Sequence, residues 1–176
     1  MSANNPLLQD FDLPPYSTIK PEHVEPAVDA ILAESRSVVA KVLASQGDAP
    51  RWENLIDALD EQGAKLGRAW SPVSHLNAVR NNPELRAAYE ACLPKLSEYW
   101  TEMGQNRALF QAYEALAASP EAANFDVAQK TILEQALRDF RLSGIDLPPE
   151  QQKRYGEIQM KPVSYTHLRA HETRGN

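Results

Sequence analysis

Apolar residues recur every three or four positions along most of this chain of 176 residues, which is the spacing of amphipathic helices. The pattern is most regular between Pro21 and Ser45. Pro21 suits the first position of a helix, and Glu22 places a carboxylate in the first turn, where the helix dipole favours it. We therefore predict a helix from Pro21 to Ser45 with one buried face. The residues of that face are Val24, Ala27, Val28, Ile31, Leu32, Val38, Val39 and Val42.

Two further helices are predicted after the loop that follows Ser45. The first should end before Pro72, because a proline inside a helix removes one backbone hydrogen bond. The second should begin at Pro83, since Asn82 is a favourable capping residue. We expect a kink in this second helix near Pro94. The apolar residues are Trp52, Leu55, Ile56, Leu59, Leu66 and Trp70 in the first, and Leu85, Tyr89, Cys92, Leu96, Tyr99 and Met103 in the second.

Three shorter helices complete the pattern. The first carries Leu109, Tyr113 and Leu116. The next runs from about Asp126 to Ser143, and Gly144 follows it where a left-handed cap is favoured. The last begins at 148–150. The predicted inward-facing residues are Ile132, Leu133, Ala136, Leu137 and Phe140 in the middle helix, and Tyr155 and Ile158 in the last.

No stretch alternates apolar and polar residues as a half-buried strand does, and no hairpin turn is indicated. The predicted fold class is therefore all-α, an irregular multi-helix bundle. We expect an extended N-terminal segment at 1–20 and a helical domain at 21–161. The character of the sequence changes after Lys161. Residues 163–173, VSYTHLRAHET, resemble one reading frame of the transposase-end adapter used to build sequencing libraries. We accordingly interpret 162–176 as a non-native, disordered tail and the helical domain as incomplete. The alternative is a genuine but divergent tail.

Charge and composition narrow the class of protein. The chain has 24 Asp and Glu against 18 Lys and Arg, with a formal charge of −6, and neither sign is clustered. This balance argues against nucleic-acid binding, which needs a concentrated basic surface. The N-terminus lacks the basic start and apolar run of a secretory signal, and no segment is apolar enough to cross a membrane. A single cysteine, Cys92, allows no internal disulfide, so we expect a cytoplasmic protein.

The chain also lacks the sequence patterns of known catalytic sites. A zinc peptidase of the H-E-x-x-H type needs two histidines one helical turn apart, and His171-Glu172 has no such second histidine. His23 and His75 have no ligand at metal-binding spacing and are interpreted as capping or surface residues. Cys92 is expected to be buried and unreactive. We therefore predict no catalytic, cofactor-binding or metal-ligating residue in this chain.

Other chemical candidates have simpler structural explanations. Ser74 precedes His75, but a nucleophile and its base are defined by geometry rather than adjacency. We expect Ser74 to satisfy backbone groups near Pro72 instead. Trp52 and Trp70 fall on apolar stripes and are assigned to core packing. The glycines are scattered and form no phosphate-binding loop.

Three stretches, at 5–32, 52–90 and 136–159, together resemble the N-terminal region of the thimet oligopeptidase-like family of zinc metallopeptidases. The first includes FDLPPYSTIKPEHVEPAVDAIL and the third includes ALRDFRLSGIDLPPEQQKRYGEIQ. The resemblance implies a helical domain that forms part of the wall of a deep channel. It also implies that H-E-x-x-H and the zinc lie far toward the C-terminus, outside this chain. The expected substrates are short, unfolded peptides.

Two functions follow as hypotheses. The first is an N-terminal fragment of a cytoplasmic zinc oligopeptidase, inactive alone, whose partner is the missing C-terminal catalytic region. The alternative is a stand-alone helical binding module without enzymatic activity, because an apolar face looks the same whichever partner covers it. An in-frame genomic continuation that encodes H-E-x-x-H would favour the first hypothesis. A natural stop near Lys161 would favour the second.

Overall fold

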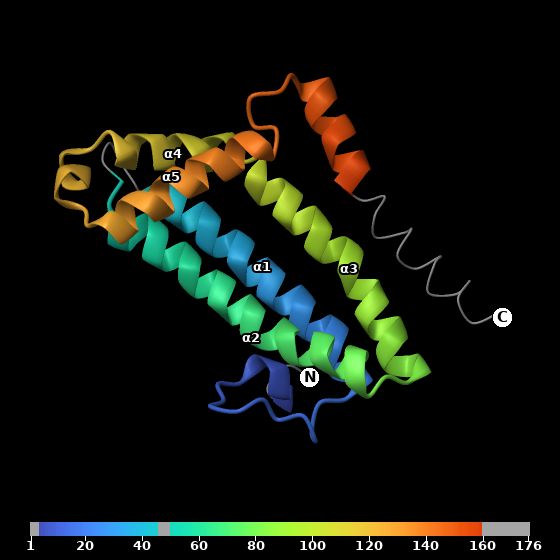
Figure 1. Cartoon of the computed structure of the whole chain (residues 1–176). Coiled ribbons are helices and arrows are strands. Elements are labelled where there is room, and N and C mark those ends of the chain that lie inside the picture. The colour runs from blue at the N-terminus through green and yellow to red at the C-terminus, as the bar shows by residue number, and fades with distance from the viewer. Residues whose placement is uncertain (1–3, 46–49, 160–176) are drawn as a thin grey trace. The chain divides into compact units, whose positions relative to one another are not determined.

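The computed structural model describes residues 4–45 and 50–159, and within them the chain is helical and contains no strand, which confirms the all-α prediction (Figure 1). The break at Lys161 and the predicted tail at 162–176 lie outside the described residues. The elements are the short 3-10 helices η2 (Pro6–Leu8) and η4 (Pro120–Asn124), the short π-helix η3 (Glu53–Asp57), the helices α1 (Pro21–Ser45), α2 (Ala58–Val79), α3 (Pro83–Gly104), α4 (Arg107–Ala117) and α5 (Val127–Leu142), and a last helix at 149–159.

The described residues divide into two compact units, and the boundary falls inside α3 between Leu93 and Pro94. The first unit contains the described parts of Met1–Ser45 together with Trp52–Leu93. The second contains the described residues from Pro94 onward, with the short stretch that precedes Trp52. Each unit has its own set of buried apolar side chains.

In the first unit, α1 and α2 lie side by side and run in opposite directions (Figure 1). Their facing sides exclude water, and burial of apolar area is the main stabilising contribution to such a pair. α1 begins and ends where the sequence predicted it. The apolar side chains of this unit with no exposed surface are Val24, Ala27, Ile31, Leu55, Val73 and Cys92.

Two details of this pair differ from the prediction. α2 does not end before Pro72 but continues through it to Val79. Pro72 and Val73 are both buried, so packing offsets the one backbone hydrogen bond that the proline removes. On α1 the buried face includes Ser35 rather than Val38, which is only half-buried. Ser35 therefore faces inward because of its position in the helical repeat, although its side chain is polar.

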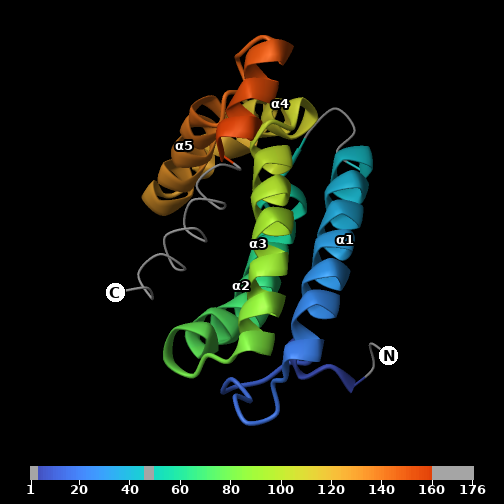
Figure 2. The ribbon, with the colours of Figure 1, turned by 90° about the vertical axis from the view of Figure 1, so that its right-hand side faces the viewer.

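The N-terminal segment at 4–20 crosses the N-terminal end of α1, as the two views show (Figure 2). Asn5 is buried and fixes this segment at both sides. Its Oδ1 accepts a hydrogen bond from the backbone N–H of Leu7 at 3.0 Å, and its Nδ2 donates to the carbonyl of His23 at 2.8 Å. The side chain of Asn5 thus satisfies a backbone N–H of η2 and also joins the N-terminal segment to the first turn of α1.

In the second unit, α4 and α5 lie side by side with opposite directions. Phe140 of α5 packs edge-on against Phe110 and Tyr113 of α4, at ring-centre distances of 5.6 Å and 5.3 Å. Asp126 caps α5 through a reciprocal pair of hydrogen bonds with Gln129. Gly144 has a φ of +84° directly after α5, as the C-terminal cap prediction requires.

Part of the predicted inward face in this unit is wrong. Ile132 is 47% exposed and Ile158 is 49% exposed, although both were expected to face the core. Ile145, which lies in the turn after α5 and was not predicted to be buried, has no exposed surface and belongs to the core of this unit. The helical pattern could not identify Ile145, because a turn has no period that marks its inward side.

Candidate functional site

The two histidines within the described residues occupy structural positions. His23 lies in the first turn of α1, and its Nδ1 accepts a hydrogen bond from the backbone N–H of Lys20 at 3.1 Å. His75 is exposed on α2 rather than in a loop, and its ring lies 5.4 Å from that of Tyr16. Neither has the surroundings of a metal ligand. Within residues 4–45 and 50–159 no three His, Cys, Asp or Glu side chains converge as a metal site would require.

The remaining chemical candidates also have structural partners. Cys92 is fully buried on α3, as predicted. Trp70 stacks on Tyr89 at 4.8 Å, which joins α2 to the first half of α3. The indole N–H of Trp52 donates to Asp57 at 2.8 Å. Trp52 and Trp70 are only partly buried, so they pack at the edge of the core rather than within it.

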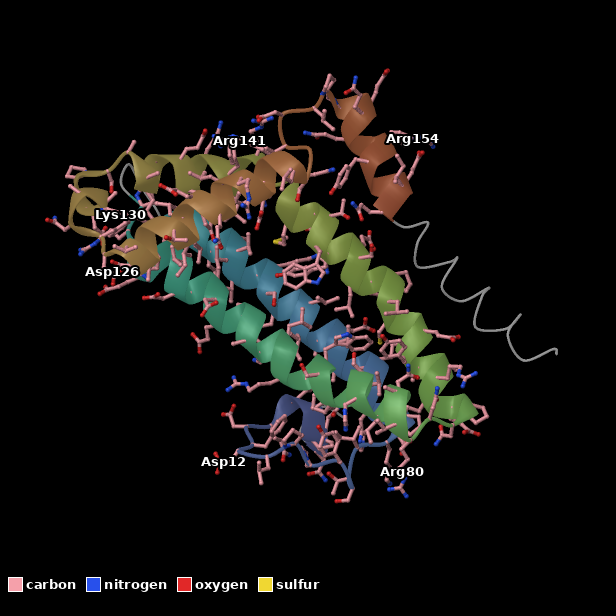
Figure 3. All side chains as sticks on the ribbon, viewed as in Figure 1. Asp12, Arg80, Asp126, Lys130, Arg141 and Arg154 are labelled. Atoms are coloured by element: carbon pink, nitrogen blue, oxygen red, sulfur yellow. The ribbon has the colours of Figure 1, made fainter. Side chains whose placement is uncertain are left out.

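An open hollow of about 570 Å³ lies beside α2 in the first unit. Its lining comes from the N-terminal segment and from one face of α2, where Glu61 and Arg68 lie two turns apart. Figure 3 shows Asp12 on this segment, beneath α2. The lining residues are Asp10, Phe11, Asp12, Glu61 and Arg68.

The chemistry of this hollow is limited by its exposure. Arg68 Nη2 lies 3.8 Å from Asp10 Oδ1, but the two side chains are 54% and 97% exposed. Ion pairs of this kind contribute about 0–1 kcal/mol, because water screens them. The lining has carboxylates and one guanidinium but no histidine, cysteine or serine that could act as a nucleophile or a base near neutral pH. The hollow thus offers exposed carboxylates beside one guanidinium.

A second group of polar side chains gathers where α3, α4 and the end of α5 meet in the second unit. Gln105, from the turn between α3 and α4, and Arg107, the first residue of α4, donate hydrogen bonds to backbone carbonyls at 143–152. Asp146 lies 3.5 Å from Arg107 and completes the group. Sequence reasoning missed these residues, because the only local signal was a short polar turn after Gly104. The hydrogen bonds from Gln105 and Arg107 hold the backbone after α5 in place.

Among the described residues, none of the helices combines the length and the apolar composition that crossing a bilayer requires. Residues 28–153 match the family model described as "Neurolysin/Thimet oligopeptidase, N-terminal domain". The chain therefore belongs to this family of peptidase N-terminal domains.

Curated relatives specify the similarity further. The chain is 52% identical over 158 residues to oligopeptidase A of Haemophilus influenzae, which covers 90% of this chain and 23% of the relative. It is 54% identical over 154 residues to oligopeptidase A of Escherichia coli, covering 88% of this chain and 22% of the relative. It is 30% identical over 165 residues to an organellar oligopeptidase A of Arabidopsis thaliana, covering 94% and 21%. The chain thus spans less than a quarter of the length of these relatives.

Proposed function

We propose that this chain is the N-terminal helical domain of a zinc-dependent oligopeptidase that hydrolyses short peptides in the cytoplasm. The observation that carries the proposal is the family match over residues 28–153. The identities of 52% and 54% to proteins named oligopeptidase A support the same peptidase class.

The proposed role of the domain is to form part of the wall of the substrate channel. Paired helices with a packed core, such as α1 with α2, suit a rigid wall, because close-packed interiors resist deformation. The domain would bind no zinc itself. His23 accepts a backbone hydrogen bond, and the carboxylates of the hollow are exposed beside Arg68, so the described residues do not fit a zinc site.

The partners follow from the same proposal. They are short unfolded peptides, which the wall would confine, and the C-terminal catalytic region that carries the zinc. The sequence contains no H-E-x-x-H, the motif that supplies two zinc ligands and a general base in such enzymes. We therefore expect the chain alone to be inactive. Purified chain, incubated with a fluorescence-quenched peptide with and without added zinc, should give no signal above the buffer rate. Cleavage that a chelator abolishes would contradict this expectation.

A hybrid enzyme tests the role of the domain directly. The segment of Escherichia coli oligopeptidase A that aligns with this chain would be replaced by the corresponding residues of this chain, at 54% identity. We expect the hybrid to hydrolyse short peptides, and a deletion of the same segment to abolish this activity. The hybrid should first be shown to fold by circular dichroism and gel filtration. A folded but inactive hybrid would favour the stand-alone binding module instead.

A further inference from the structure

The last described helix, at 149–159, contributes little to the apolar core. None of its residues is buried, Tyr155 is half-buried and Ile158 is 49% exposed. The preceding helix α5 differs, because it buries Leu133 and Phe140. Arg154 projects outward from helix 149–159 (Figure 3). A segment with few buried apolar contacts opens at a lower free-energy cost than the core beside it.

The turn before this helix is held firmly. Ile145 has no exposed surface, and its carbonyl accepts a hydrogen bond from the guanidinium of Arg107. Arg107 also lies 3.5 Å from Asp146. Gly144, with its φ of +84°, reverses the chain ahead of Ile145. The chain is therefore fixed to the second unit up to Asp146, and the helix that follows is attached less tightly.

Two glutamine side chains connect the helix to this fixed part. Gln105 Nε2 donates to the carbonyl of Ser143 at 3.2 Å and to the carbonyl of Gln152 at 3.3 Å. Gln152 Nε2 donates in the other direction, to the carbonyl of Ile145 at 3.0 Å. The bonds from Gln105 are near the long end of the range for hydrogen bonds, so each is individually modest.

The helix also approaches α3 through a small residue. A Cβ atom added to Gly156 would lie 3.6 Å from Cγ2 of Thr101, which is an ordinary contact distance. The backbone of the helix thus lies close to α3 without large side chains between them. This contact can open without leaving a large cavity in the core, because Gly156 and Thr101 are not part of it.

We propose that helix 149–159 docks on the second unit and detaches from it as one element, with Gln105 and Gln152 as the latch and residues 146–148 as the hinge. Arg107 and Ile145 hold the turn in both states. The inference rests on burial and hydrogen bonding within the second unit and is independent of the proposed peptidase role.

Hydrogen exchange measured by mass spectrometry on the 176-residue chain tests the latch. In the unaltered chain, the backbone amides at 153–159 should exchange at least about tenfold faster than those in the middle of α5. Gln105→Ala should accelerate the amides at 153–159 by about a further fivefold, the factor that corresponds to one typical hydrogen bond. Gln111→Ala, at an exposed glutamine on α4, serves as the matched control and should change nothing.

The amides of α4 and α5 report on folding in every variant, so a general loss of structure would be recognised. Two results would overturn the proposal. One is exchange at 153–159 as slow as in α5 in the unaltered chain. The other is a Gln105→Ala variant whose exchange at 153–159 matches that of the Gln111→Ala control.

A reversible crosslink provides a second, independent test. The double variant Thr101→Cys/Gly156→Cys places two thiols across the contact between α3 and the helix. The native Cys92 is buried, whereas positions 101 and 156 are only half-buried and open to the disulfide reagent. After oxidation by a disulfide reagent, exchange at 153–159 should slow by at least about tenfold, and reduction should reverse the effect. Failure of the crosslink to form, or equal exchange in the oxidised and reduced states, would contradict the docked geometry.

Discussion

At the residue scale, the clearest departure from a simple hydrophobic pattern is a polar pair inside the first unit. Ser35 of α1 is 1% exposed, and its hydroxyl donates to Oε1 of Gln62 on α2, which is 9% exposed, at 3.5 Å. The sequence pattern missed both residues, because it assigns serine and glutamine to the surface. Spacing alone places Ser35 on the stripe of Ile31 and Val39. The sequence therefore predicted the bounds of α1 correctly, but it predicted only part of the set of side chains that this helix buries.

This polar pair leads to a prediction about stability. Ser35→Ala removes the donor and leaves the buried Gln62 carbonyl oxygen without this partner, so we expect a loss of about 1 kcal/mol in the free energy of unfolding. The double variant Ser35→Ala/Gln62→Leu should recover most of that loss, because replacing both polar partners with apolar groups can be nearly neutral. Urea denaturation followed by circular dichroism measures both effects. Ser37→Ala, at an exposed serine of the same helix, is the control and should change stability by less than about 0.5 kcal/mol.

Neighbouring residues of α5 provide a second prediction. Leu133 is 5% exposed and Ile132 is 47% exposed, although the sequence pattern placed both on the inward face. Leu133→Ala should lower the free energy of unfolding by about 2–5 kcal/mol, because it leaves a cavity between α4 and α5. Ile132→Ala should cost less than about 1 kcal/mol. Equal losses for the two variants, measured by the same denaturation experiment, would show that α5 is rotated relative to the described packing.

At the element scale, helix ends were easier to predict than helix interiors. Asn82 caps α3 through a bond of 2.7 Å to the N–H of Leu85, and Gly144 has the predicted positive φ after α5. These signals are local, because a cap satisfies backbone groups within three residues. Pro72 misled the prediction, since its effect depends on distant packing that buries it within α2. Local chemistry thus predicted the termini, and tertiary contacts decided whether a helix continued.

Two glycines make this element-scale difference measurable. Gly63 lies on the exposed side of α2, and a Cβ atom there would meet nothing within 4 Å. Gly63→Ala should raise the free energy of unfolding by about 0.5–1 kcal/mol, because alanine loses less backbone entropy in a helix. Gly144→Ala should lower it by about 1 kcal/mol or more, since its φ of +84° is unfavourable for alanine and its Cβ would lie 2.9 Å from Leu147 Cδ1. Thermal unfolding of both variants checks that the free energy of unfolding rises in one and falls in the other. A Gly144→Ala variant that is more stable than the unaltered chain would contradict the cap after α5.

At the scale of the whole molecule, the sequence indicated the family but could not indicate the two units. The resemblance rested on long stretches, and the family match over residues 28–153 confirms it. The boundary at Leu93 and Pro94 lies inside one helix, where no change in the apolar pattern marks it. The expected kink at Pro94 stays a prediction. A candidate site could not be predicted from sequence either, because the polar group around Gln105 comes from segments that are distant along the chain.

The boundary inside α3 leads to a final prediction about cooperativity. Pro94 has no N–H, so the helix lacks one backbone hydrogen bond at the point where the contacts divide. We therefore expect the two units to open separately. Ile31→Ala, in the fully buried part of α1, should accelerate amide exchange in α1 and α2 by at least about thirtyfold and leave α4 and α5 unchanged. Leu133→Ala should produce the converse pattern. Equal acceleration throughout both units in either variant would show instead that the described residues unfold as one cooperative body.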